Sequence, residues 1–256
     1  MDLGLAGRVA LVTGGSKGIG FAVARQLAEE GAELVLVSRT EPELAAAAGS
    51  IAARTGRTPR FAIADVGDDA SVAALAERVG PVAVLVNAAA TPNAGGFAES
   101  ELADHINVKV RGALRMARAF APGMVAAGWG RIINISGLGA RQTSSVVGSV
   151  RNVAVVAMTK NLADELGPQG VNVTVVHPGT TVTERTPAMV ARLAEQRYGG
   201  DTVAAEQAMA RGVSIGRLVT AAEVADVVAF LASPRSVAIN GDVVAAGGGA
   251  RGAIHY

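Results

Sequence analysis

Residues 8–20 read RVALVTGGSKGIG, and this stretch decides the fold. Its first six residues form a short apolar run with β-branched side chains, which is typical of a buried strand. Glycines follow at positions 14, 18 and 20, and residues 18–30 have the composition and length of a helix. The stretch therefore predicts a strand, a tight turn and a helix, which together begin a βαβ unit.

The same alternation of strand and helix continues along the chain. Strand-like runs occupy residues 8–13, 33–38, 60–64, 82–86, 131–136, 171–176 and 238–244, and helical patterns include 18–30, 42–54, 71–79 and 153–166. Continuous apolar runs suit parallel strands that are covered on both faces. No repeat or linker divides the chain, so residues 1–256 are expected to form one Rossmann-like, doubly wound α/β domain, with helices flanking a parallel sheet of about seven strands.

One segment, at about 184–216, breaks this alternation. It has helical patterns and many charged residues, but no strand follows promptly. Two interpretations remain open for it, a solvated helical excursion and a mobile substrate lid. Insertions at the carboxyl edge of such a sheet border the ligand crevice, which is the basis of the second interpretation.

The overall composition limits the classes of partner. The chain has 23 Lys and Arg against 22 Asp and Glu, so it lacks the basic field that binds nucleic acid or anionic lipid. It has no cysteine, and its three histidines are scattered, so we expect no metal site. The first apolar run is too short for a signal or membrane helix, and the expected location is the cytoplasm.

The glycine-rich turn has the properties of a phosphate-binding site. Gly14 allows a tight turn, Gly18 lets backbone amides approach a pyrophosphate, and Gly20 permits close packing of the helix. The start of the following helix adds free N–H groups and the positive end of a dipole. We therefore expect the turn to bind a dinucleotide through Gly14, Ser16, Lys17, Gly18, Ile19 and Gly20.

The end of the second strand indicates which dinucleotide binds. NAD sites place an acidic residue roughly 20 residues beyond the glycines, where it accepts a hydrogen bond from the ribose 2′-hydroxyl. Here Ser38 and Arg39 occupy that place, and Lys17 lies in the turn nearby. A hydroxyl and two cations suit a 2′-phosphate, so the sequence predicts NADP(H) in preference to NAD(H).

With these motifs assembled, the chain resembles the short-chain dehydrogenase/reductase family over nearly its whole length. Further motifs that carry the resemblance are Asp65-Val66 after the third strand, Asn87-Ala88-Ala89 after the fourth, Asn107 in the next helical pattern, and Pro178-Gly179 with Thr181 and Thr183 after the sixth. The resemblance implies cofactor contacts at these positions and a catalytic role for Asn107. It also implies a small-molecule substrate and assembly as a homodimer or homotetramer.

The family's proton-transfer group is missing from the sequence. The resemblance implies a Tyr with a Lys four residues later, and a Ser upstream that orients the substrate oxygen. Counting along the matching helix puts Gly148 and Asn152 at the first two positions, and Gly137 at the third with Ser136 one residue early. The chain has only two tyrosines, Tyr198 and Tyr256, and neither begins such a motif.

Three functions therefore remain open. The first is an oxidoreductase with a rebuilt site, in which the candidate catalytic residues are Asn107 and Ser136. Other donors considered for that site are Thr143, Ser144, Ser145, Ser149, Tyr198 and Tyr256, with Arg151 supplying charge. The second is a non-catalytic NADP(H)-binding sensor, scaffold or subunit of a hetero-oligomer, and the third is a lyase or isomerase on the same fold. The substrate and the direction of reaction are not readable from the sequence.

Overall fold

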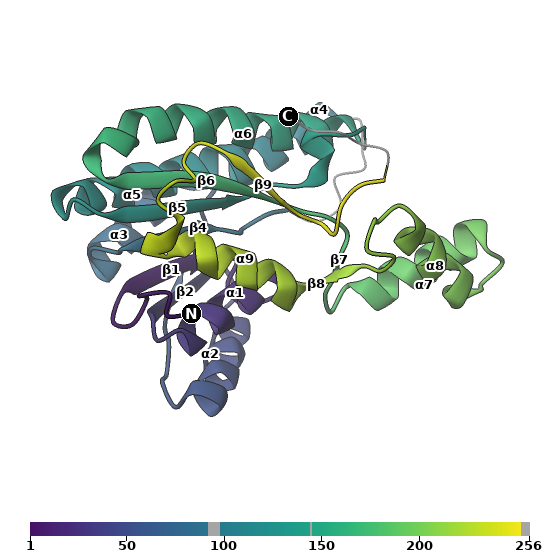
Figure 1. The fold of residues 1–256 in the computed structure, drawn as a ribbon, viewed down its shortest axis with the longest axis horizontal. Coiled ribbons are helices and arrows are strands. Elements are labelled where there is room, and N and C mark those ends of the chain that lie inside the picture. The colour runs from purple at the N-terminus through teal and green to yellow at the C-terminus, as the bar shows by residue number, and fades with distance from the viewer. Residues whose placement is uncertain (92–97, 144, 252–256) are drawn as a thin grey trace.

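The computed structural model of the protein describes residues 1–91, 98–143 and 145–251, and its centre is a seven-stranded parallel sheet (Figure 1). The strand order is β3-β2-β1-β4-β5-β6-β9. The strands are β1 Val9–Thr13, β2 Glu33–Ser38, β3 Arg60–Ile63, β4 Val84–Asn87, β5 Gly130–Ile135, β6 Val171–Pro178 and β9 Val243–Ala246. Each neighbouring pair is parallel, so the predicted doubly wound sheet is confirmed.

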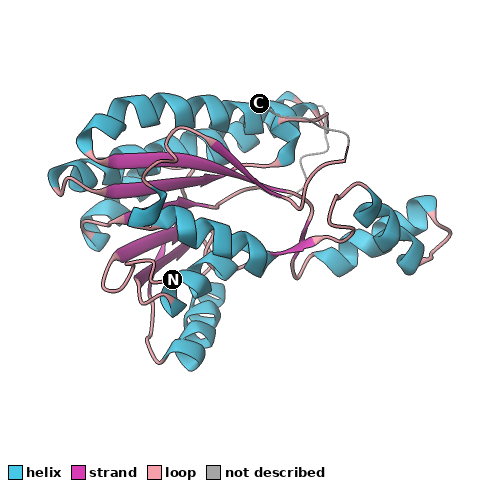
Figure 2. Ribbon diagram, viewed as in Figure 1, coloured by secondary structure: helices cyan, strands magenta, loops and turns pink. Residues whose placement is uncertain are grey.

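Helices cover both faces of the sheet (Figure 2). One face packs on α1 Gly18–Glu29, α2 Glu41–Thr55 and α9 Ala221–Ala232, and the other on α3 Asp69–Val79, α5 Gly112–Ala126 and α6 Val146–Leu166. Side chains alternate along β1: Ala10 and Val12 enter the first core, whereas Leu11 enters the second. Because both faces are buried, the strands are apolar throughout, as the sequence indicated.

The last strand begins later than the sequence predicts, at residue 243 instead of 238. Asn240 and Gly241 explain the difference, because they form hydrogen bonds with both the amide and the carbonyl of Val173 in β6. The Asn240 side-chain oxygen accepts from the Val173 amide at 2.8 Å, and the Gly241 amide donates to the Val173 carbonyl at 2.8 Å. Gly241 does so in the left-handed region, at φ +74°, so an extended strand starts only after it.

The segment at 184–216 holds two helices, α7 Thr186–Arg197 and α8 Thr202–Arg211, which project from the main body (Figure 1). They pack together around a small apolar cluster of Val190, Ala194 and Ala205. A short parallel pair that the sequence did not predict, β7 Thr181–Val182 and β8 Val219–Thr220, connects them to the sheet domain. A capping box of Thr220 and Glu223 then starts α9 directly after β8.

The connection from β4 to α5 contains a change of helix type. The helix α4, Glu99–His105, continues without a break into a π-helical turn, η1 Ile106–Arg111, and then into α5. Single π-helical turns often occur at functional sites. Within the described ranges, none of these helices, nor any other, is both long and apolar enough to cross a membrane.

Candidate active site

A groove of about 540 Å³ lies at the carboxyl ends of β1, β2, β4, β5 and β6. This is the place where open α/β sheets bind their ligands. It is lined by most of the residues that the sequence assigned to the cofactor: Gly14, Ser16, Lys17, Gly18, Ile19, Gly20, Ser38, Arg39, Asp65, Val66, Ala88, Ala89, Pro178 and Thr183. The volume and the position suit an extended ligand of dinucleotide size.

The glycine-rich turn has the geometry expected of a phosphate site. Gly14 and Gly18 have φ values of +66° and +54°, which side-chain-bearing residues rarely adopt. A Cβ on Gly20 would lie 2.3 Å from the carbonyl oxygen of Gly14. Gly20 is therefore required so that α1 can begin directly against the turn.

The backbone amide of Gly18, at the start of α1, has no partner within the helix and donates to an anionic side chain. The Gly18 N–H donates to the Glu184 carboxylate at 3.2 Å, just ahead of α7. A helix N-terminus favours negative charge because its first N–H groups lack helical partners. The Glu184 carboxylate therefore occupies the position at the start of α1 where an oxygen of a pyrophosphate would bind.

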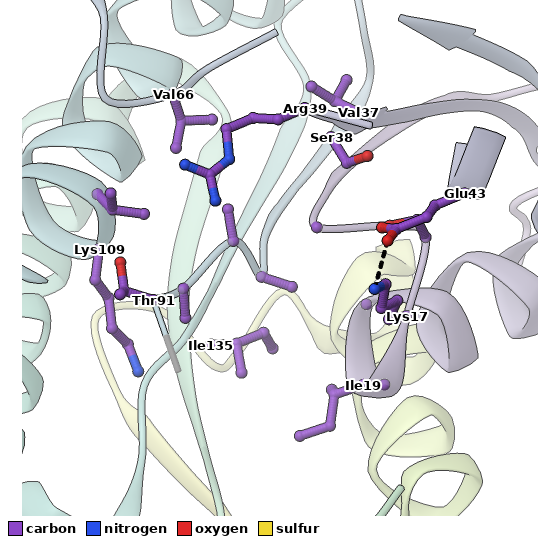
Figure 3. A pocket seen from close by; sticks show the side chains of 18 of the residues that line it. Lys17, Ile19, Val37, Ser38, Arg39, Glu43, Val66, Thr91, Lys109 and Ile135 are labelled. Carbon is purple, nitrogen blue, oxygen red and sulfur yellow. Dashed lines mark ion pairs between the residues drawn. The ribbon is translucent and has the colours of Figure 1, made fainter. Parts of the chain in front are cut away.

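The two cations near the end of β2 are each paired with a carboxylate, and Figure 3 shows the pair of Lys17 with Glu43. Lys17 lies 2.5 Å from Glu43 on α2, and Arg39 lies 3.9 Å from Asp65. Arg39 is 74% exposed, so its pairing is weak and its guanidinium is free to turn toward a ligand. The groove thus has two basic groups on the side where a 2′-phosphate would lie, but Glu43 opposes one of them.

Three predicted cofactor residues, Asn87, Gly179 and Thr181, lie outside the described lining of the groove and support it from behind. The Asn87 amide donates to Asn134 at 2.9 Å inside the sheet. A Cβ on Gly179 would lie 3.0 Å from Gly247, so this glycine permits two loops to approach closely. The Thr181 hydroxyl donates to the Gly179 carbonyl at 3.0 Å and fixes the end of that loop.

Ser136, which lines the groove, is buried at the end of β5, and its hydroxyl proton is already used. The hydroxyl donates to the backbone carbonyl of Asn152 at 3.1 Å. A Cβ on Gly137 would lie 3.0 Å from the Asn152 amide nitrogen, so Asn152 fills the space beside these residues. Gly148 lies one turn earlier in α6, where its amide bonds the capping hydroxyl of Ser145. Ser136 can accept a hydrogen bond from a ligand, but donating one requires it to release Asn152.

Asn107 faces away from the groove. Its amide donates to the Gly67 carbonyl at 3.0 Å, and its side-chain oxygen accepts from Arg115 at 3.0 Å. It is not among the described residues that line the groove. In this structure the asparagine fixes the loop after β3 against α5, and its predicted catalytic role has no geometric support.

The other hydroxyl donors considered from the sequence are placed elsewhere or lie outside the described residues. Tyr198 packs on the apolar cluster of α7 and α8. Ser145 accepts a hydrogen bond at the start of α6. Thr143 and Ser149 are not part of the described lining of the groove. Ser144 and Tyr256 lie outside the described residues.

Lys109 is the residue that sequence reasoning missed. It lies on η1, is 8% exposed, and lines the groove next to Ser136. Its ammonium group donates to the Ser136 carbonyl at 3.0 Å. Burial, with a smaller contribution from the nearby Arg151 cation, lowers the pKa of Lys109 to about 7. Its apolar neighbours Val108 and Val110 do not mark it as buried, because adjacent residues of a helix point to different faces.

Arg151 connects Lys109 to a polar cluster on α4. Its guanidinium donates to the Thr91 carbonyl at 3.1 Å and contacts the ring of His105. His105 in turn lies 3.8 Å from Glu101. Burial, followed by the Arg151 charge, lowers the pKa of His105, which keeps the ring neutral. The described residues contain no cluster of three or more potential metal ligands.

Comparison with known proteins places the chain among nicotinamide-dependent enzymes. A family profile described as enoyl-(acyl carrier protein) reductase matches residues 14–251. The short-chain reductase protein NovJ of Streptomyces niveus is 35% identical over 249 residues, which cover 94% of this chain and 93% of the relative. An NADPH-dependent aldehyde reductase 2 of Arabidopsis thaliana is 37% identical, with 96% of this chain and 94% of the relative covered.

A solved structure agrees over the full fold. The L-sorbose reductase of Gluconobacter frateurii, crystallised with NADPH and L-sorbose, superposes with a TM-score of 0.92 at 30% identity. The match covers 99% of this chain and 100% of that chain. The groove described above therefore lies in a scaffold that is shared with reductases.

Proposed function

The chain belongs to the short-chain dehydrogenase/reductase family of NAD(P)-dependent oxidoreductases, and on that premise we propose that it transfers hydride between NADP(H) and a carbonyl or alcohol carbon through a non-standard proton-transfer site. The observation that carries the proposal is the groove in which the glycine-rich turn, Arg39 and Thr183 line one continuous surface. NADPH, when bound, supplies the hydride.

The residues present fit a dinucleotide phosphate. Gly20 lets α1 begin directly against the turn, because a Cβ there would meet the Gly14 carbonyl, and the Gly18 amide already binds a carboxylate in place of a phosphate oxygen. The last residue of β2 is Ser38 instead of an acidic residue, so no negative charge at that position repels a 2′-phosphate. Arg39 and Lys17 supply positive charge on either side of it. The similar NADPH-dependent aldehyde reductase, and the similar L-sorbose reductase crystallised with NADPH, support the same preference.

We further propose that the segment at 184–216 acts as a lid over the substrate end of the groove. Thr183, Glu184 and Arg185 line the groove and lead directly into α7. Because Glu184 holds the Gly18 amide, a phosphate that binds there displaces this carboxylate and frees the start of α7. Cofactor binding is in this way coupled to the position of the lid. Assembly as a homodimer or homotetramer stays a prediction.

Binding and turnover test the proposal separately. Titration with NADPH and with NADH is expected to show tighter binding of NADPH. Ser38→Asp places a carboxylate at the end of β2 and should reverse that order, because it repels the 2′-phosphate and accepts from a ribose hydroxyl. Tighter binding of NADH by the wild-type protein would contradict the choice of cofactor.

Turnover is measured on a panel of aldehydes, ketones, ketoses and β-ketoacyl thioesters, by the loss of NADPH absorbance. Reduction of at least one class is expected. Tight NADPH binding without turnover on any class would instead support the non-catalytic sensor, scaffold or subunit. Conversion of a substrate without net change in NADPH would support a lyase or isomerase.

A further inference from the structure

The side chain of Lys109 has the position required of a group that reaches the reacting atoms. It enters the groove from η1, across from the Lys17–Glu43 pair (Figure 3). Ser136, Thr91 and Pro178 also line the groove, so Lys109 lies on the same surface as the end of β6. The resemblance to the family implies that the segment from Pro178 to Thr183, at this end, holds the nicotinamide of the cofactor. A substrate carbonyl held above the nicotinamide is therefore within the space that this ammonium group borders.

The ammonium group of Lys109 has N–H donors that are not engaged by the described part of the chain. Within the described part of the chain, its ammonium group makes one hydrogen bond, to the Ser136 carbonyl, and has no carboxylate within ion-pair distance. An ammonium group has three N–H donors. A buried lysine with a purely structural role is normally paired with a carboxylate, because an uncompensated buried charge is costly. Lys109 is paired with a carbonyl and otherwise faces the groove.

Burial, and to a smaller extent a neighbouring cation, lower the pKa of Lys109 and so favour loss of its proton. Arg151 on α6 is the nearby cation, and His105 and Glu101 on α4 complete the cluster. Arg151 is itself partly buried and holds the Thr91 carbonyl, so its position is fixed. A second cation nearby disfavours the charged form of a lysine, which is a known way of activating a lysine amine.

We propose that Lys109 exchanges a proton with the substrate oxygen in this chain, and that Arg151 is a positioning residue that sets how readily it does so. The inference rests on the proposed oxidoreductase function and names the group that performs its acid/base step. It assigns to Lys109 the task for which Ser136 is poorly suited, since the Ser136 proton is donated to Asn152. No tyrosine lines the described part of the groove.

The step balances without a further reactant. In reduction, the carbonyl carbon accepts the hydride, the electron pair of the C=O bond moves to oxygen, and oxygen takes one proton from the Lys109 ammonium group. Lys109 is left as a neutral amine and regains a proton from water before the next turnover. In oxidation, neutral Lys109 takes the hydroxyl proton while the carbon gives up its hydride.

The pH dependence follows from the pKa of about 7 for Lys109. Reduction needs the protonated lysine, so its rate should fall as pH rises through about 7, whereas the rate of oxidation should rise. The neighbouring ring of His105 does not produce this inflection, because burial and Arg151 lower its pKa below the ordinary value of 6.5. Arg151→Gln removes the nearby cation and should move the inflection to higher pH.

The decisive variants are Lys109→Met and Lys109→Arg, with Lys160→Met as the matched control. Lys160 is an exposed lysine on α6 that pairs with Asp164. Lys109→Met should lower kcat by at least about 10²-fold, the usual contribution of a general acid or base, with NADPH affinity unchanged within about threefold. Lys109→Arg keeps the charge but does not titrate, so its pH profile should lose the inflection. Lys160→Met should behave as wild type.

A second measurement does not depend on turnover. The pKa of Lys109 is lower when folded than when unfolded, so the cost of burying its charge is complete below about pH 7 and disappears as pH rises toward 10.5. Lys109→Met should therefore melt above wild type at pH 6, and this difference in Tm should narrow by pH 9. A difference that is constant over that range would overturn the proposal, because Lys109 would not be titrating.

The outcomes separate the inference from the function on which it rests. Wild-type turnover that Lys109→Met retains, with the same pH profile, overturns the role of Lys109 and leaves the oxidoreductase intact. Absence of turnover by wild type on every substrate class overturns the proposed function and this inference with it. An inflection that stays in place in Arg151→Gln overturns the role of Arg151 alone.

Discussion

Gly20→Ala tests the contact on which the cofactor site is built. The added Cβ would lie 2.3 Å from the Gly14 carbonyl oxygen and 2.8 Å from its carbonyl carbon. Contacts below 3.0 Å do not persist, so α1 and the turn must separate by at least 0.7 Å, the difference between 3.0 and 2.3 Å. The clash is with backbone, which cannot move aside like the end of a flexible side chain. The substitution should therefore displace the amides that face a pyrophosphate.

Two magnitudes follow from that displacement. Overpacking of this kind costs about 1–3 kcal/mol, which corresponds to a loss of roughly 2–12 °C in Tm for a domain of this size. Hydrogen bonds from the start of α1 also lose their geometry, so the Kd for NADPH should rise at least about tenfold, or about 1.4 kcal/mol. Thermal unfolding and fluorescence titration with NADPH measure the two effects.

Gly49→Ala is the matched control, because it makes the same chemical change inside α2. Apart from the backbone of its own helix and its chain neighbours, nothing lies within 4 Å of a Cβ at this position, and the residue is in a helix interior. Alanine there should stabilise the protein by about 0.5–1 kcal/mol, through its better helix propensity, and leave NADPH binding unchanged. If Gly20→Ala also bound NADPH with the wild-type Kd and melted no lower, the close approach of α1 to the turn would be wrong.

Three further substitutions address the cofactor and the assembly. Arg39→Ala should weaken NADPH binding about tenfold and leave NADH binding within about twofold, as isothermal titration would show, since only NADPH carries the 2′-phosphate; equal losses would contradict this role. Glu184→Gln should tighten NADPH binding severalfold at low salt, and less at high salt, because the amide competes poorly for the start of α1; an unchanged Kd would contradict the competition. Val150 is exposed on α6 with Val146 and Val153, and such an apolar patch suits a subunit interface. Val150→Lys should therefore lower the molecular mass measured by light scattering and leave NADPH binding unchanged. A monomeric wild type would contradict the predicted oligomer.

Much of the fold and of the cofactor site follows from local sequence. The strands are short apolar runs, the turn needs glycine at fixed positions, and Ser38 is the last residue of the strand that positions it. Each of these features depends on residues that are close in the chain. The start of β9 was harder to predict, because it depends on the Asn240 side chain reaching Val173 in another strand.

The acid/base site could not be read in the same way, because it depends on which face of a helix meets the groove. Asn107 and Lys109 are two residues apart, so in a helix they point in nearly opposite directions. The resemblance drew attention to Asn107, which bonds Gly67 and Arg115 outside the groove. Lys109 faces inward from the π-helical turn. Helical periodicity alone does not reveal which of the two is inside, because both lie in a π-helical turn whose period differs from that of the α-helices on either side of it.

Another buried cation in the same protein shows why Lys109 is better explained by chemistry than by packing. Arg131 is 3% exposed, yet its guanidinium donates to the carbonyls of Ser233 and Gly130 and stacks on Trp129 at 4.6 Å. Burial lowers the pKa of Arg131 only to about 10, so its guanidinium stays charged at neutral pH. Its hydrogen bond to Ser233 joins β5 to the end of α9. Lys109 has neither the aromatic face nor the second carbonyl, and its pKa lies near neutrality. One cation is satisfied by the fold, and the other is held where its remaining hydrogen bonds are made to whatever occupies the groove.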